Sequence, residues 1–149
     1  MKSLVVFYSR SNITKKLALK IASEINADTE EIKSTVNYNG KLGYAKAIKD
    51  AVSTKIIDLE PFKYNPKDYD VVYLGGPVWA SKAANPLISY IKLNENNFNN
   101  VKFFLTAGGS GFESSFEQLE KYSKKPLKTL ALTTNEVKNN NYSLSSFIS

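Results

Sequence analysis

The sequence predicts an α/β protein in which a doubly wound, five-stranded parallel sheet forms the middle layer of a three-layer α/β/α sandwich. Buried β-branched and aromatic runs alternate with helical patterns along the whole chain, and this alternation favours a parallel sheet covered on both faces. The chain has 149 residues, of which 42% are apolar, so it can bury a sizeable core. No repeat and no linker rich in Pro, Gly or Ser divides it, so we expect a single domain over residues 1–149.

The first half of the chain opens with KSLVVFY at residues 2–8, which predicts a buried strand. The helix expected next has apolar Leu17, Ile21 and Ile25 at a spacing of four, which places them on one face. The elements of this half after the first strand are a helix, a more polar strand and a second helix: NITKKLALKIASEI (12–25), DTEEIKS (28–34) and GKLGYAKAIKDAV (40–52).

The second half continues the alternation. YDVVYLGG at residues 69–76 is a continuous β-branched and aromatic run that predicts the third strand, and a helix opens near Pro86 because proline is favoured in a first turn. The elements expected after the third strand are a helix, a buried strand, a helix, the last strand and a short closing helix: NPLISYIKL (85–93), VKFFLTAGG (101–109), FESSFEQLEKYS (112–123), PLKTLALT (126–133) and SLSSFIS (143–149).

The composition excludes several kinds of catalytic site. The chain contains no cysteine and no histidine, so it can form no disulfide, thiolate nucleophile, serine–histidine triad or Cys/His zinc site. Redox or group-transfer chemistry would have to come from a bound cofactor.

Charge and hydropathy bear on partners and compartment. The formal net charge is +6, which suits an acidic partner or an anionic ligand. The lysines are spread along the chain and form no basic stripe, so we do not expect the protein to bind nucleic acid. The N-terminus has no signal-peptide pattern, and no apolar stretch approaches the roughly 20 residues that span a bilayer. We therefore expect a cytoplasmic protein without a membrane segment.

The segment after the first predicted strand reads SRSNITKK. Ligands of open α/β sheets bind outside the carboxyl ends of the strands, and a helix N-terminus there offers unpaired backbone N–H groups to a phosphate. Side-chain donors and two lysines add to this potential: Ser9, Ser11, Asn12, Thr14, Lys15 and Lys16. The alternative is that Ser11, Asn12 or Thr14 caps the helix beside a solvated surface.

Two further segments follow the third and fourth predicted strands. In PVWAS, Pro77 stiffens the chain and Trp79 offers a flat ring that can stack on a planar heterocycle, or else covers apolar surface as a core or rim residue. In AGGSGF, the glycines let a flat ligand approach the backbone closely, or else form an ordinary tight connection. Three such segments at one edge of the sheet together indicate a site that binds phosphate, stacks on a ring and donates hydrogen bonds.

These motifs resemble a known family. FYSRSNITKKLA, YDVVYLGGPVW and FFLTAGGSGF look like the three flavin-binding loops of the flavodoxin-like proteins, and the resemblance covers essentially the whole chain. It implies a strand order of 2-1-3-4-5 and FMN as the cofactor. The family loop usually has Gly then Asn before its last Thr, where this chain has Asn12 and Ile13; Asn tolerates the left-handed backbone better than most residues.

The resemblance also implies roles for particular residues. It implies that the FMN phosphate is wrapped by Ser9, Arg10, Ser11, Asn12, Ile13 and Thr14. It implies that the isoalloxazine is lined by Pro77, Val78, Trp79 and Ala80. It implies that the pyrimidine side is closed by Thr106, Ala107, Gly108, Gly109, Ser110, Gly111 and Phe112.

Two functions remain open on this basis. The first is a small electron-transfer carrier, in which FMN shuttles electrons between redox partner proteins that the basic charge predicts to be acidic. The second is an FMN-dependent NAD(P)H:quinone-type oxidoreductase, which needs an open pocket over the flavin. The chain has no long insertion to enclose a nicotinamide, which favours the carrier, although residues 34–43 could contribute to such a pocket.

Overall fold

In the computed structural model, which describes residues 1–53 and 56–149, a six-stranded sheet forms the centre of the protein. The strands are β1 (Ser3–Phe7), β2 (Asp28–Glu31), β3 (Val71–Trp79), β4 (Lys82–Ala83), β5 (Val101–Ala107) and β6 (Thr129–Thr133). Five of them are parallel in the order β2-β1-β3-β5-β6, and the two-residue β4 lies off this path. The predicted order of 2-1-3-4-5 is therefore confirmed.

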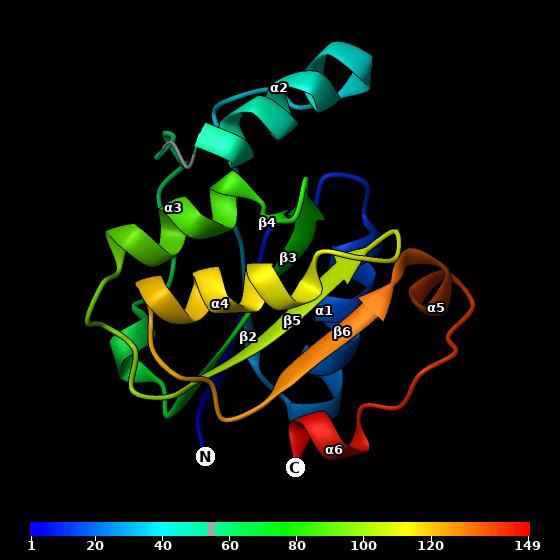
Figure 1. Cartoon of the computed structure of the whole chain (residues 1–149). Helices are drawn as coiled ribbons and strands as arrows, with labels where there is room; N and C mark the ends of the chain where they lie inside the picture. The colour runs from blue at the N-terminus through cyan, green and yellow to red at the C-terminus, as the bar shows by residue number, and fades with distance from the viewer. Residues whose placement is uncertain (54–55) are drawn as a thin grey trace.

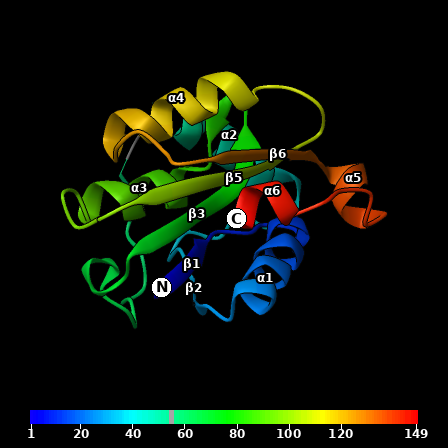
Figure 2. The same ribbon diagram turned by 90° about the horizontal axis from the view of Figure 1, so that it is seen from below.

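Helices cover both faces of the sheet (Figures 1 and 2). They are α1 (Ile13–Ile25), α2 (Gly40–Ser53), α3 (Asn85–Leu93), α4 (Phe112–Tyr122), α5 (Thr134–Lys138) and α6 (Ser145–Ile148). Figure 2 shows α3 and α4 on one side of the sheet, with α1 and α6 on the other. The core divides in the same way, because one apolar cluster lies against α3 and α4 and the other against α1 and α6.

Strand β1 illustrates why a central parallel strand is a continuous apolar run. Leu4, Val5 and Val6 are each 0% exposed, with alternate side chains in the two clusters. On α1, Leu17 and Ile21 of the predicted apolar face are buried. Helix α2 lies differently: Figure 1 shows it beyond the carboxyl ends of the strands, and its Ala47 and Ala51 join the apolar cluster on the α3 and α4 side.

Four elements differ from the sequence prediction: β3 is longer than predicted, and β4, α5 and a 3-10 turn are additional. Strand β3 continues to Trp79, because it pairs with β5 as far as Pro77 and then turns back to pair with β4. Segment 77–79 therefore belongs to a strand and is not a loop. Helix α5 and a 3-10 turn at Pro66–Asp68 are additional to the prediction, and α5 begins with a capping box between Thr133 and Glu136.

Within the residues that the structure describes, we find no helix with both the length and the apolar character needed to cross a bilayer.

Candidate functional site

The segment that follows β1 and the carboxyl-terminal ends of β3 and β5 meet at one cavity of about 120 Å³ at the carboxyl edge of the sheet. Its lining residues are Arg10, Ser11, Ile13, Thr14, Tyr44, Pro77, Val78, Trp79, Thr106, Ala107, Gly108 and Thr134. Ten of these were predicted from the sequence, at least three from each of the three segments. We call this space the edge cavity.

The β1–α1 segment, residues 9–14, presents backbone donors. Asn12 adopts the left-handed conformation, with φ of 67°, immediately before α1, and its side chain makes no capping hydrogen bond. Among the described residues, no group accepts a hydrogen bond from the backbone N–H of residues 11–14. Unpaired N–H groups at the N-terminus of a 13-residue helix form an environment that favours an anion.

The two lysines that follow contribute less positive potential than the sequence suggests. Lys15 forms an ion pair with Glu31 of β2, with 3.1 Å between Nζ and Oε1. Lys16 donates to the backbone carbonyl of Lys138 at 3.3 Å. Arg10 is the cationic side chain that lines the cavity, and its guanidinium carbon lies 4.8 Å from the centre of the Tyr44 ring.

A buried hydroxyl pair lies at the cavity. Thr14 of α1 and Thr106 of β5 are each 2% exposed, and their Oγ1 atoms are 2.8 Å apart. A hydroxyl carries one hydrogen, so one member of the pair donates to the other and the second keeps a hydrogen that it can donate elsewhere. The pair joins two of the three predicted segments.

The β3–β4 hairpin, residues 77–83, is held in place by α4. Its turn residues Ala80 and Ser81 have φ of 51° and 63°. The Ser81 carbonyl accepts a 2.7 Å hydrogen bond from the Ser114 hydroxyl, and the Ala83 N–H donates to Gln118 at 2.9 Å. Because both bonds end on α4, this wall of the edge cavity is rigidly positioned.

Trp79 lies deeper than a rim residue. It is 3% exposed, and its ring makes edge contacts with Tyr8 and Tyr38 at centroid distances of 5.6 and 5.1 Å. Pro77 and Val78, by contrast, are half-buried. Trp79 therefore belongs to the core cluster and also lines the cavity, and its stacking on a planar ring stays a prediction.

The glycine-containing segment after β5, residues 108–111, is open at one end and closely packed at the other. A Cβ atom built on Gly108 or Gly109 would meet nothing within 4 Å, so a flat group has room to approach the backbone there. Gly111 has φ of 88°, and a Cβ on it would lie 2.9 Å from Val78 Cγ1. This glycine is required where the segment packs against the hairpin.

Several predicted residues lie next to the edge cavity without lining it. They are Ser9, Asn12, Ala80, Gly109, Ser110, Gly111 and Phe112. Two lining residues were not predicted. The capping box that precedes Thr134 could have been recognised in the sequence TTNE, whereas nothing local marks Tyr44, because the placement of α2 is a tertiary feature.

Comparison with known proteins agrees with this architecture. The family model described as Flavodoxin matches residues 2–143. No curated protein sequence matches the chain.

Solved structures share the fold. A flavoprotein from Lactobacillus acidophilus NCFM in complex with FMN has a TM-score of 0.77 and 23% identity, and the match covers 95% of this chain and 99% of that one. A protein from Bacteroides eggerthii DSM 20697 classed as a flavoprotein has a TM-score of 0.76 and 21% identity, with 99% and 98% covered. An NADH:FMN oxidoreductase in its apo form has a TM-score of 0.58 and 10% identity, with 99% and 84% covered. At such identities the likeness concerns the fold.

Proposed function

The chain belongs to the flavodoxin family, and from this premise we propose that it binds FMN at the edge cavity and works as a small electron-transfer carrier. The observation that carries the proposal is the meeting of three separate segments, the one after β1 and the carboxyl-terminal ends of β3 and β5, at a single cavity. When bound, FMN would supply electron-transfer chemistry that the side chains of this protein cannot perform.

The residues present fit an FMN phosphate. The N–H groups of residues 11–14 have no partner among the described residues, and the hydroxyl pair of Thr14 and Thr106 has one hydrogen to donate. Arg10 adds a positive charge. A cavity of about 120 Å³ has room for about four water-sized groups, which suits a phosphate but not a whole cofactor. The open backbone at Gly108 and Gly109 leaves space beside it for a flat ring.

The lining chemistry supports a carrier. The described residues that line the edge cavity include no carboxylate, and the chain has no histidine. The protein therefore brings no general acid or base that titrates near neutral pH to this cavity. Exposed residues at the rim, among them Ala80 and Gly109, leave the site within reach of a second protein.

A basic surface next to the site supports an acidic partner. Helix α2 lies beyond the carboxyl edge of the sheet (Figure 1) and carries the exposed Lys41, Lys46 and Lys49. Its one acidic residue, Asp50, is 4% exposed. Together with the net charge of +6, this arrangement would speed encounter with a protein of acidic surface.

The first prediction concerns the phosphate. We expect the purified protein to bind FMN more tightly than riboflavin, because only FMN can accept hydrogen bonds from residues 11–14 through a phosphate. Thr14→Ala should weaken FMN binding by about 1–3 kcal/mol, the usual contribution of a hydrogen bond to a charged group. Titrations followed by flavin fluorescence measure both quantities.

The matched control is Ser23→Ala, which removes a hydroxyl from an exposed position on the same helix. It should leave FMN affinity unchanged. Equal affinity for FMN and riboflavin would show that residues 9–14 do not bind the phosphate.

The second prediction separates the carrier from the NAD(P)H:quinone-type oxidoreductase. We expect the FMN-loaded protein to oxidise NADH or NADPH in the presence of menadione no faster than free FMN at the same concentration. The reason is that the chain has no long insertion that could enclose a nicotinamide beside the flavin. Steady-state loss of nicotinamide absorbance measures the rate, and turnover well above that of free FMN would favour the reductase.

A further inference from the structure

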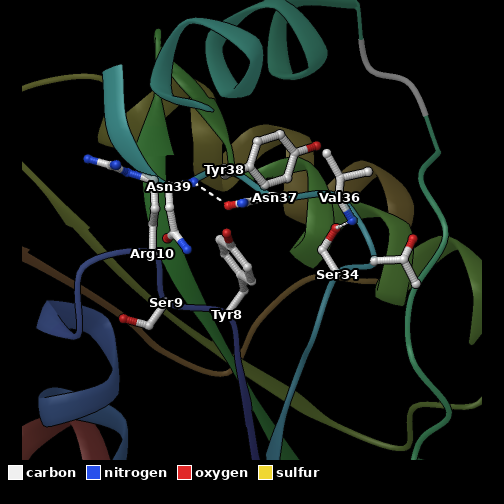
Figure 3. Close-up of a pocket in the computed structure, with 9 residues that line it drawn as sticks. Tyr8, Ser9, Arg10, Ser34, Val36, Asn37, Tyr38 and Asn39 are labelled. Atoms are coloured by element: carbon white, nitrogen blue, oxygen red, sulfur yellow. Dashed lines mark hydrogen bonds between the residues drawn. The ribbon is translucent and has the colours of Figure 1, made fainter. Parts of the chain in front are cut away.

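A second cavity lies beside the edge cavity, between the end of β1 and segment 34–39 (Figure 3). Its volume is about 290 Å³, and Arg10 lines both cavities. Its lining residues are Tyr8, Ser9, Arg10, Ser34, Thr35, Val36, Asn37, Tyr38 and Asn39. We call it the polar cavity, since most of its lining side chains are hydroxyls and amides.

Tyr8 offers a hydroxyl that has no hydrogen-bond partner within residues 1–53 and 56–149. The residue is 7% exposed, and Figure 3 shows its hydroxyl directed into the cavity toward Asn37. Among the described residues no group is hydrogen-bonded to this hydroxyl, although the ring packs on Trp79. The hydroxyl is not one of the buried unpaired side-chain atoms of the described residues, so water reaches it, and a ligand in the cavity can replace that water as its partner.

The hydroxyl keeps its proton over the whole physiological range. Burial raises the pKa of Tyr8 to about 12, and the positive charge of Arg10 opposes part of this rise. Tyr8 is therefore a neutral hydrogen-bond donor, and it interacts electrostatically with the positive charge of Arg10.

Three other side chains have their acceptor atoms occupied by backbone N–H groups. Ser34 Oγ accepts from the N–H of Val36 at 2.9 Å, and Asn37 Oδ1 accepts from the N–H of Asn39 at 2.9 Å. In the same way, Ser9 Oγ accepts from the N–H of Lys15 at 3.2 Å. What these side chains can still offer to a ligand is mainly their donor hydrogens.

The charge of the lining has one sign. Arg10 is the one ionised side chain among the described residues that line the polar cavity. Behind the wall, the carboxylate of Asp50 accepts a 2.7 Å hydrogen bond from the Tyr38 hydroxyl and lies 3.8 Å from Lys46 Nζ. A donor-rich cavity with a positive charge at its edge favours an anion.

From this geometry we propose that the polar cavity binds the oxyanion group of a small molecule other than the flavin, either a phosphate or a carboxylate, with the Tyr8 hydroxyl on the cavity wall as a hydrogen-bond donor and Arg10 as the positive charge. The volume lies at the lower end of the roughly 300–1,000 Å³ typical of ligand sites, so the ligand is a small metabolite. This site goes beyond the proposed flavin function, but it shares Arg10 with the proposed FMN phosphate site, so the protein is tested both with and without FMN.

The test is an NMR titration of FMN-loaded, ¹⁵N-labelled protein with inorganic phosphate, acetate and the uncharged acetamide. FMN fills the phosphate site of residues 11–14, so an added anion is directed elsewhere. We expect amide shifts in residues 8–10 and 34–39 with phosphate or acetate, and weaker ones with acetamide. Binding of phosphate alone would identify a phosphate ester, and binding of acetate alone a carboxylate; either result supports the site.

Tyr8→Phe removes the hydroxyl and keeps the ring against Trp79. It should lower the affinity for the bound anion about tenfold, as expected when a hydrogen bond to a charged group is lost. The matched control is Tyr73→Phe, which removes a hydroxyl from another tyrosine, 3% exposed, in the core cluster of the opposite sheet face. The control should bind the anion as the parent chain does.

Three results would overturn the proposal: no shift in residues 34–39, equal binding of acetate and acetamide, or unchanged affinity in Tyr8→Phe. Shifts confined to residues 11–14 would also overturn it, because the anion would then occupy the edge cavity. If the protein fails to take up FMN, which visible absorbance shows directly, the same titration without FMN still tests residues 34–39. Failure of the flavin proposal is therefore distinguishable from failure of this one.

Discussion

Trp79→Ala should lower the free energy of unfolding by about 3–5 kcal/mol, the range expected when a large buried aromatic side chain is removed. Trp79 is 3% exposed and packs on the rings of Tyr8 and Tyr38, so its loss leaves a cavity among three elements. Domains of this size are stable by only about 5–15 kcal/mol, so the variant should lie close to unfolding at moderate temperature.

Urea unfolding followed by far-UV circular dichroism measures this loss. Tryptophan fluorescence cannot be the probe, because Trp79 is the one tryptophan of the chain. Trp79→Phe is the companion variant: it keeps an aromatic ring between Tyr8 and Tyr38 and should lose less stability. A loss below about 1 kcal/mol in Trp79→Ala would contradict the observed burial.

The same variants test the proposed stacking of Trp79 on the flavin. If the indole contacts the ring, FMN should strongly quench the emission of the parent protein. Trp79→Phe, which stays folded, should then bind FMN less tightly by about 0.5–1.5 kcal/mol. No quenching together with unchanged FMN affinity would make Trp79 a core residue alone.

The second large effect is a loss of stability at alkaline pH. Burial raises the pKa of Tyr8 to about 12, and burial is also the main cause of the raised pKa of Tyr73. Burial, followed by a hydrogen bond to a carboxylate, raises the pKa of Tyr38 and Tyr69. For Tyr90 the charge of a nearby carboxylate adds to burial in raising the pKa.

The direction follows from proton binding. An unfolded tyrosine loses its proton near pH 10, whereas these folded tyrosines keep theirs, so the folded state binds more protons above that pH. The contribution of these tyrosines to the free energy of unfolding is therefore complete below about pH 10. Above that pH the free energy of unfolding falls by about 1.4 kcal/mol per pH unit for each tyrosine that stays protonated only in the folded state. Lys102 acts in the opposite direction, because burial lowers its pKa below 10.5. Its contribution to the free energy of unfolding therefore rises with pH until about pH 10.5.

Urea unfolding at a series of pH values between about 9 and 12 measures the effect, with tyrosinate absorbance as a second signal. Tyr8→Phe should show a shallower decline than the parent chain. Tyrosines that all ionise near pH 10 in the folded protein, with no decline in stability, would contradict the prediction.

The sequence pattern determined the fold class and most of the edge cavity, and the resemblance to the flavodoxin-like proteins implied the strand order. Parallel strands buried on both faces must be continuous apolar runs, so β1, β3 and β5 were recognisable from local composition. Because their carboxyl ends share one edge, the segments after them had to meet there. Asn12 was recognisable in the same way, as a residue that tolerates the left-handed backbone with which α1 begins.

Only the tertiary structure decided where the aromatic residues and α2 lie. The run PVWAS reads as a loop, but pairing with β5 and β4 extends β3 to Trp79, and that register buries the indole under Tyr8 and Tyr38. Helix α2 is recognisable as a helix, yet its place beyond the sheet edge depends on contacts between residues distant in sequence, such as Gly43 against the backbone of Tyr38. The unpaired Tyr8 hydroxyl is likewise invisible in the sequence, because a hydrogen bond that is absent has no local pattern and is apparent only when every neighbour has been placed.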